Sequence, residues 1–211
     1  MSGKRVTVVL GYRDRELDRV KRSLASLNLQ TCDDFCVNFV DYGSRPLNAR
    51  AVRELTDSFT FCRHLYSDTR GHTWNRSRAL NIGIRHSRTE FVLTTDVDMI
   101  FAPNFVETLL LKQDGNTIVC CAPRWLPKTF TDWDDLTTSG DDFPLGDQSQ
   151  LGGCQCVPRD ILTQIHGFDE SFEYWGMEDT DIQWRLTKLG LRQTWIDDKT
   201  SIFHQWHPKE R

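Results

Sequence analysis

Apolar and polar positions follow two alternating patterns along the first half of the chain. Short β-branched and apolar runs predict strands, at residues 5–10, 35–40, 59–66 and 91–95. Stretches with apolar residues three or four positions apart predict helices, over residues 17–27, 48–58 and 76–86. Asp14, just ahead of the first of these helices, is the expected N-cap. Strand and helix therefore follow one another in a regular order.

This order predicts an α/β fold with a mainly parallel sheet whose two faces are covered by helices. In such sheets, ligands collect beyond the carboxyl ends of the strands. Three features of the sequence fall there: a loop at 11–13, a turn at 41–44 and the acidic pair Asp96 and Asp98. We therefore expect the ligand site at this edge of the sheet.

The second half of the chain is less regular. Residues 128–150 form a polar stretch that is too long for a tight turn. We interpret it as an active-site loop that closes over the donor, with a plain surface loop as the alternative. A strand is then expected at 154–157, a short helix from Pro158, and a further helix over 178–189 that ends at Gly190.

Composition narrows the function classes. A chain of 211 residues is expected to form one domain. Its 26 Lys and Arg against 30 Asp and Glu give a net charge of −4, and these charges are scattered, which argues against a nucleic-acid partner. No transmembrane segment or signal peptide is expected, so the prediction is a cytoplasmic location. Seven irregularly spaced cysteines are typical of buried thiols rather than of a disulfide framework.

The acidic pair is the first candidate for chemistry. Asp96 and Asp98 are one residue apart at the end of an apolar strand, where both carboxylates can turn toward one cation. Oxygen ligands beside a diphosphate suit Mg²⁺ or Mn²⁺. The alternative is a solvated turn, because an Asp-x-Asp triplet by itself is common.

Two histidines near the C-terminus could complete the shell of such a cation. His204 is the preferred ligand and His207 the second choice, since imidazole is acceptable to Mn²⁺ among oxygen ligands. The alternative for either histidine is a hydrogen-bonded side chain with no metal.

Acidic residues also open the expected helix at 178–189, directly after the aromatic pair Tyr174 and Trp175. An aromatic ring can pack on the C–H face of a sugar while a neighbouring carboxylate accepts the proton of the attacking hydroxyl. Glu178 and Asp179 are the candidates for such roles. Asp181, or another of the three acids, is an ordinary partner of the helix dipole in the alternative view.

Basic residues cluster at the start of the helix at 76–86. Arg76 is a candidate phosphate ligand, because a guanidinium matches phosphate oxygens in bidentate geometry. Arg78, Arg85 and Arg88 are expected to line a solvated helix face instead.

Taken in chain order, these motifs resemble those of inverting glycosyltransferases with the GT-A fold. The likeness is greatest to the family 2 transferases, including bacterial chondroitin-type polymerase domains, and to the catalytic half of the β-1,4-galactosyltransferases. It covers nearly the whole chain, although Tyr42 replaces the second acid of the common Asp-Asp-Gly-Ser turn. The matching elements are Asp41-x-Gly43-Ser44, Asn75-Arg76-x-x-x-x-Asn81-x-Gly83, Asp96-Val97-Asp98, Trp175-Gly176-x-Glu178-Asp179 and His204.

The resemblance implies a role for each of these residues. Residues 1–123 would bind the nucleotide sugar, and residues 124–211 would bind the acceptor and carry the catalytic base. The implied donor-side residues are Asp41 at the base, Trp74 and Arg76 beside the nucleotide, Asp96 at the ribose or metal, and Asp98 and His204 at Mn²⁺. The implied acceptor-side residues are Asp179 as general base, with Glu178, Trp175 and Tyr174 on the acceptor sugar.

The sequence thus predicts a metal-dependent inverting glycosyltransferase. It would move a hexose or N-acetylhexosamine from a nucleotide sugar, expected by resemblance to be a UDP-sugar, to a saccharide or other hydroxyl acceptor. Polysaccharide biosynthesis is the expected setting, and the chain is compatible with one module of a larger polymerase. The alternatives are a non-catalytic carbohydrate-binding or inactive transferase-like domain and, in another enzyme class, a nucleotidyltransferase, for which residues 11–14 lack the required phosphate loop.

Overall fold

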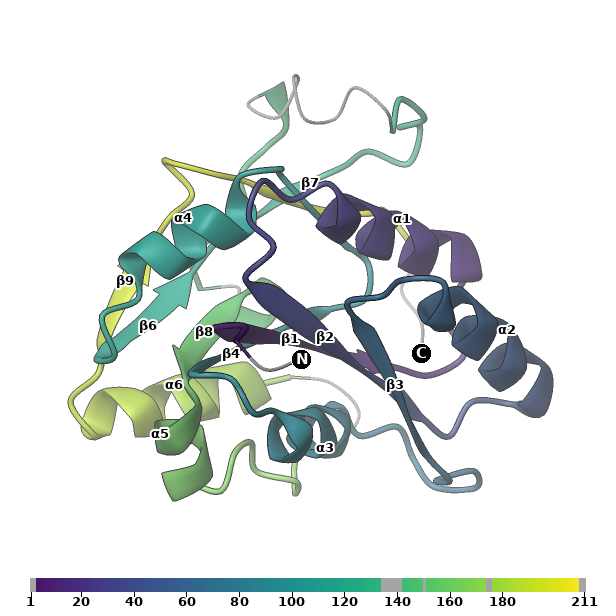
Figure 1. Cartoon of the computed structure of the whole chain (residues 1–211), viewed down its shortest axis with the longest axis horizontal. Coiled ribbons are helices and arrows are strands. Elements are labelled where there is room, and N and C mark those ends of the chain that lie inside the picture. Colours follow the sequence, from purple (N-terminus) through teal and green to yellow (C-terminus); the bar gives the residue numbers. More distant parts are fainter. Residues whose placement is uncertain (1–2, 134–141, 150, 174–175, 209–211) are drawn as a thin grey trace.

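The structure, a computed structural model, describes residues 3–133, 142–149, 151–173 and 176–208. At its centre is a seven-stranded sheet in the order β3-β2-β1-β4-β8-β6-β9 (Figure 1). Within this sheet, β8 runs antiparallel to its neighbours β4 and β6, and the other adjacent pairs are parallel. The strands are β1 (Val6–Tyr12), β2 (Phe35–Tyr42), β3 (Cys62–Ser67), β4 (Phe91–Asp96), β6 (Thr117–Cys120), β8 (Gln155–Pro158) and β9 (Arg192–Trp195).

Helices cover both faces of this sheet, as Figure 1 shows. One face packs against α1 (Leu17–Asn28), α2 (Pro46–Asp57) and α4 (Phe105–Lys112). The other face packs against α3 (Arg76–His86), α5 (Arg159–Gln164) and α6 (Glu178–Lys188). The predicted α/β class with a mainly parallel, doubly covered sheet is therefore confirmed.

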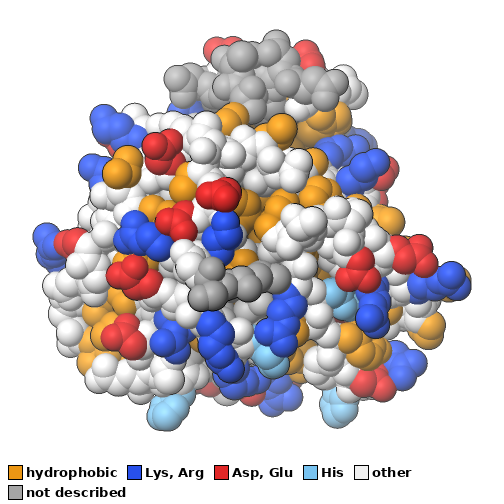
Figure 2. Space-filling view, viewed as in Figure 1, with side chains coloured by type: hydrophobic (Ala, Val, Ile, Leu, Met, Phe, Trp, Pro, Cys, Tyr) orange, Lys and Arg blue, Asp and Glu red, His pale blue; other side chains and the backbone are white. Residues whose placement is uncertain are grey.

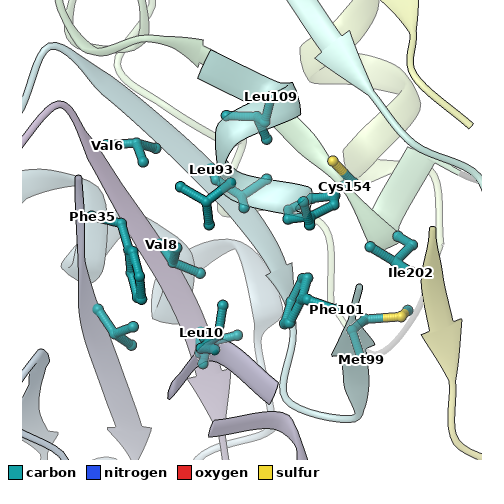
Figure 3. Close-up of a cluster of buried hydrophobic side chains, with 14 of the residues drawn as sticks. Val6, Val8, Leu10, Phe35, Leu93, Met99, Phe101, Leu109, Cys154 and Ile202 are labelled. Carbon is teal, nitrogen blue, oxygen red and sulfur yellow. The ribbon is translucent and has the colours of Figure 1, made fainter. Parts of the chain in front are cut away.

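The strand β1 shows why the central strands are apolar on both sides. Val6, Val8 and Leu10 point into one cluster of buried side chains, where Figure 3 shows them beside Phe35 and Leu93. Val9 points the opposite way, into the cluster beneath α3 and α6. Successive residues of a strand face opposite sides, so a strand covered on both faces needs a continuous apolar run.

The helix α3 lies unusually close to β1 and β2. A Cβ placed on Gly83 would lie 2.3 Å from Cγ1 of Val9 and 3.3 Å from Cγ2 of Val40, so only a glycine permits this approach. Asn38 of β2 donates from Nδ2 to the carbonyl oxygen of Gly83 across 2.9 Å. This hydrogen bond and the close packing at Gly83 hold α3 against β1 and β2.

A second sheet, of three strands, stands beside the end of β4. It has the order β5-β10-β7, with β5 (Met99–Phe101), β7 (Pro123–Trp125) and β10 (Ile202–His204). In the antiparallel pairing of β10 with β5, His204 lies opposite Met99. This pairing brings the end of β10 to the turn between Asp96 and Met99.

Both ends of the segment 128–150 pack on this small sheet. Phe130, Trp133 and Phe143 cover a cluster formed by Ile100, Leu126 and Phe203. Residues 134–141 and 150 lie outside the described residues, so the proposed closure of this segment stays a prediction.

Most predicted elements lie within one or two residues of the observed bounds, and the third strand differs most. The helix at 76–86 was predicted at its observed bounds, but the third strand begins at Cys62 rather than near residue 59. Asp14 is not the N-cap of α1, which has Glu16 in that position. The carboxylate of Asp14 instead accepts hydrogen bonds from the backbone N of Arg45 and from Nδ2 of Asn48, where it joins the loop after β1 to the start of α2.

Three global expectations can be compared with the described residues. All seven cysteines are free thiols, and five of them are buried. Lys and Arg side chains are interspersed with Asp and Glu over the face in Figure 2. Of the helices in the described part of the chain, none has the length and apolar character needed to span a bilayer.

Candidate metal and transfer site

Three side chains converge at the junction of the two sheets. Asp98 follows β4, His204 ends β10 and His207 lies three residues further on; their ligand atoms all lie within 4.8 Å of one another. Nε2 of His207 is 3.2 Å from Oδ2 of Asp98, and Nε2 of His204 is 3.9 Å from the same oxygen. Both histidines weighed as ligands therefore reach the same carboxylate.

The chemistry of this group fits a divalent cation. Oδ1 of Asp98 and Nδ1 of His204 are buried and have no hydrogen-bond partner. Burial lowers the pKa of His204 against the opposing charge of Asp98, so its imidazole is neutral and keeps a lone pair for a metal. One carboxylate with two imidazoles is an acceptable ligand set for Mn²⁺.

The charges inside the group are balanced by its own members. Burial disfavours ionisation of Asp98, but the hydrogen bond from His207 and the nearby imidazoles outweigh burial and hold the pKa of Asp98 below its ordinary value. The hydrogen bond to Asp98 in turn raises the pKa of His207. A cation bound here would provide the favourable interaction with the Asp98 carboxylate that His207 provides in its absence.

Asp96 lies beside this group but does not join it. Among the described residues, the cluster consists of Asp98 and the two histidines. Oδ1 of Asp96 accepts a hydrogen bond from Nε of Arg76 across 2.9 Å, and its side chain is 37% exposed. A role for Asp96 at the ribose or the metal stays a prediction.

Arg76 connects a carboxylate at the end of β4 with carboxylates at the start of α6. It lies in the first turn of α3, where the side chain of Asn75 caps the helix by accepting from the backbone N of Arg78. Nη1 of Arg76 is 2.7 Å from Oδ1 of Asp179 and 3.6 Å from Oε1 of Glu178. Nη2 donates to the carbonyl oxygen of Gly152 across 2.9 Å. The guanidinium is therefore bound to carboxylates on two elements, and its predicted contact with phosphate stays a prediction.

The environment of Asp179 suits a proton acceptor. Burial raises its pKa above the ordinary value, and the charge of Arg76 opposes that rise. Gln155 donates from Nε2 to the backbone oxygen of Asp179 across 3.1 Å, which fixes the start of α6 on β8. With Oδ1 bound to Arg76, Oδ2 is the oxygen left to meet a hydroxyl.

Gly152 is a feature of the site that the sequence reasoning missed. It lies in a short 3₁₀ turn, Leu151–Gly153, and a Cβ placed on it would lie 2.7 Å from Oδ2 of Asp179. The absence of a side chain at position 152 therefore permits the close approach of the backbone to this oxygen. The glycine pair in the sequence was a usable signal, because a close backbone approach is one of the reasons a protein needs glycine.

The residues expected to bind the acceptor are only partly described. Tyr174 and Trp175 lie outside the described residues. Glu178 is 5% exposed, and its Oε2 accepts a hydrogen bond from the backbone N of Gly176. Asp181 lies in the first turn of α6, where a partner of the helix dipole was expected, and it also forms an ion pair with Arg185 across 2.7 Å.

At the carboxyl end of β2, residues from this strand and from the loop before α3 come together. Asp41 is fully buried; its Oδ1 accepts from the backbone N of Ser44, and its Oδ2 has no hydrogen-bond partner. The ring of Trp74 meets Tyr42 edge to face, with centroids 5.8 Å apart. Arg13, which the sequence reasoning did not single out, ties this region together through three backbone oxygens, those of Gly43, Thr69 and His72.

Comparison with known protein families identifies the class to which this fold and site belong. The model of glycosyl transferase family 2 matches residues 7–162, and a model described as the N-terminal domain of galactosyltransferase matches residues 138–208. The first match covers more than half of the chain. The chain therefore belongs to glycosyl transferase family 2, and the resemblance drawn from its motifs is confirmed.

The individual relatives have low sequence identity to this chain. Human chondroitin sulfate synthase 3 is 28% identical over 128 residues, which are 56% of this chain and 14% of that protein. Its mouse counterpart is 25% identical over 146 residues, 63% of this chain and 16% of that protein. The chain thus spans only a small part of the length of these relatives.

Solved structures resemble the whole domain. A GalNAc-T7 structure with UDP, GalNAc and Mn²⁺ has a TM-score of 0.74 at 12% identity, covering 97% of this chain and 44% of that one. The mannosyltransferase PcManGT from Pyrobaculum calidifontis, with GDP-Man and Mn²⁺, has a TM-score of 0.68 at 22% identity, covering 98% and 58%. At these identities the likeness concerns the fold, and the expected GT-A fold is confirmed.

Proposed function

We propose that this chain is a metal-dependent inverting glycosyltransferase domain. It transfers a hexose or N-acetylhexosamine from a nucleotide sugar, with UDP as the preferred nucleotide, to a hydroxyl group of a saccharide acceptor. The observation that carries the proposal is the continuity of the two halves of the site. Asp98 of the metal group is two residues from Asp96, and Arg76 joins Asp96 to Asp179 by contacts of 2.9 and 2.7 Å.

On the donor side, Asp98, His204 and His207 would hold Mn²⁺ or Mg²⁺, supported by their convergence and by the unpartnered Oδ1 of Asp98. The bound ion would act as a Lewis acid on the diphosphate leaving group. Asp41 and Trp74 are proposed at the nucleotide base, and Asp96 at the ribose. The unpaired Oδ2 of the buried Asp41 supports this role, because a base N–H would satisfy it.

The nucleotide assignment also draws on relatives. The two structural neighbours are complexes with UDP or GDP-Man, and both contain Mn²⁺. The curated relatives are chondroitin sulfate synthases, which supports a polysaccharide acceptor and a setting within a larger polymerase.

On the acceptor side, Asp179 would take the proton of the attacking hydroxyl. Oδ1 is fixed by Arg76, so Oδ2, beside Gly152, would receive the proton. Attack from this side, opposite the departing diphosphate, is a single displacement and inverts the anomeric carbon. Positioning of this kind suits a transition state with oxocarbenium character. Glu178, Tyr174 and Trp175 are proposed to contact the acceptor sugar.

Asp179→Asn tests this function against a non-catalytic carbohydrate-binding domain. The asparagine keeps the size of the side chain but cannot accept the proton, so turnover should fall by about 10²–10⁴-fold with nucleotide affinity retained. Turnover and nucleotide binding would be measured on the same preparations. A binding domain would show no turnover in the unchanged protein, and full turnover in Asp179→Asn would remove Asp179 as the base.

A further inference from the structure

A buried glutamine lies between the two histidines of the metal group. Gln205 is 1% exposed. Its backbone N donates to the carbonyl oxygen of Asp98 across 3.1 Å. This one residue therefore joins the segment that carries His204 and His207 to the turn that carries the carboxylate.

The side chain of Gln205 binds this segment to α1. Its Nε2 donates to the carbonyl oxygen of Arg19 across 3.0 Å. Its Oε1 accepts from Nη1 of Arg22 across 3.3 Å. The amide is thus engaged on both its donor and its acceptor side by residues one turn apart on the same helix.

Arg22 is held in turn from its other side. Its guanidinium carbon lies 4.1 Å from the centre of the Trp133 ring, within the range of a cation–π contact. Trp133 meets Phe130 edge to face, with centroids 4.9 Å apart. Arg22 therefore stands between the C-terminal segment and the start of the segment 128–150.

These contacts matter because the described residues that follow β10 have no regular structure to hold them. Residues 205–208 belong to no helix or strand, so the place of His207 depends on its own side-chain contacts and on those of its neighbours. Its Nε2 is 3.2 Å from Oδ2 of Asp98, and its Nδ1 is 2.8 Å from the carbonyl oxygen of Pro208. Nδ1 of His204 has no hydrogen-bond partner, and its ring packs against Trp125, with centroids 4.5 Å apart. Groups that orient metal ligands from behind commonly change metal affinity 10–100-fold when they are replaced.

We propose that Gln205 and Arg22 are positioning residues of the metal centre. Their contact holds the C-terminal segment on α1 so that both imidazoles face Asp98. The inference rests on the metal site of the proposed function and adds to it two residues that would not themselves touch the ion.

The test compares Mn²⁺ binding, with UDP present, in four proteins: the unchanged chain, Gln205→Leu, Arg22→Met and Gln113→Leu. Leucine keeps the approximate volume of glutamine and removes its hydrogen bonds. Gln113 is the matched control because it is also buried, and its Nε2 donates to two backbone oxygens, those of Thr117 and Cys156. Binding would be followed by the electron paramagnetic resonance of Mn²⁺, including the echo modulation from coordinated imidazole nitrogen, with thermal stability measured in EDTA.

We expect Gln205→Leu to raise the Mn²⁺ dissociation constant about 10-fold or more and to weaken the imidazole modulation. Arg22→Met, a change at a partly exposed position, should act in the same direction, which keeps the test valid if Gln205→Leu does not fold. Gln113→Leu should lower thermal stability but leave the Mn²⁺ affinity and the imidazole modulation unchanged. Unchanged Mn²⁺ affinity and modulation in both Gln205→Leu and Arg22→Met would overturn the inference and leave the proposed function standing. Failure of the unchanged chain to bind Mn²⁺ would overturn both.

Discussion

Arg76 and Asp179 form an ion pair of 2.7 Å across 103 positions of the chain. Each lies in the first turn of its helix, α3 and α6, so two helix N-termini meet at this point. The positive ends of both helix dipoles favour a negative charge there. Burial raises the pKa of Asp179 above its ordinary value, and the charge of Arg76 opposes that rise.

Replacing Arg76 with lysine distinguishes a role in fixing Asp179 from a role in binding the diphosphate. A lysine ammonium is a point charge and cannot bridge Asp96, Asp179 and the Gly152 carbonyl together. We expect turnover to fall about 10- to 100-fold, because the base is no longer fixed, while UDP affinity changes little. Arg78→Lys on the same helix, 48% exposed, is the control. A large loss of UDP affinity in Arg76→Lys would assign this residue to the diphosphate instead.

Gly152→Ala is expected to impair the transfer step. The new methyl group would meet Oδ2 of Asp179 at 2.7 Å and force the carboxylate to move. Turnover should decrease by about 10-fold or more, since small displacements of a reacting group are costly. Gly153→Ala in the same turn is the matched control, because its methyl group would make ordinary contacts of 3.4 Å or longer. Equal activities of the two variants would show that the space beside Asp179 is not needed.

Gly83→Ala tests the close packing of α3. In an exposed helix interior this change stabilises by up to about 1 kcal/mol. Here the methyl group would lie 2.3 Å from Cγ1 of Val9, so overpacking should dominate and lower the free energy of unfolding by about 1–3 kcal/mol. Urea denaturation measures this directly. A gain in stability would mean that α3 can move away from the sheet at little cost.

Alkaline pH should destabilise the fold through its buried thiols. Burial raises the pKa of Cys62 and of Cys120 from 9.0 to about 12, and it also raises the pKa of Cys121, Cys154 and Cys156. Below pH 9 these thiols are protonated in both the folded and the unfolded chain. Above it the unfolded chain loses protons that the folded chain keeps, so stability falls as pH rises, by up to about 1.4 kcal/mol per pH unit for each thiol.

Urea midpoints between pH 7 and 11, in the presence of a reductant, check this dependence. The midpoint should be nearly constant up to about pH 8.5 and then decrease, and Cys120→Ala should show a shallower decrease. A midpoint that does not change up to pH 11 would contradict the buried state of these thiols.

The local pattern of apolar and polar residues was sufficient to predict much of the fold. The spacing of apolar residues predicted α3 at its observed bounds, because Asn75 supplies an N-cap and the helix signal is contained within eleven residues. The strand that ends at Asp96 was found in the same way. The direction of β8 was not predictable, since strand pairing depends on residues far apart in the sequence.

The sequence predicted which residues belong to the site better than it predicted the contacts between them. Asp98, His204 and His207 were singled out, and the structure brings them together. The partners of Arg76 were missed, because they lie on β4 and α6 and meet only when the chain folds. The prediction of Asp14 as an N-cap was wrong for a related reason. Its carboxylate has the chemistry of an N-cap, but it accepts hydrogen bonds from Arg45 and Asn48 instead.

The most direct test of a metal-dependent transfer is the release of free nucleoside diphosphate. It would be measured with a panel of nucleotide sugars, in the presence of Mn²⁺ or of EDTA. The proteins compared are the unchanged chain, Asp98→Ala and, as control, Asp160→Ala, which removes an exposed carboxylate of α5. We expect release from one donor that requires Mn²⁺, is lost in Asp98→Ala and is retained in Asp160→Ala. Release that persists in EDTA or in Asp98→Ala, or no release from any donor, would contradict this expectation.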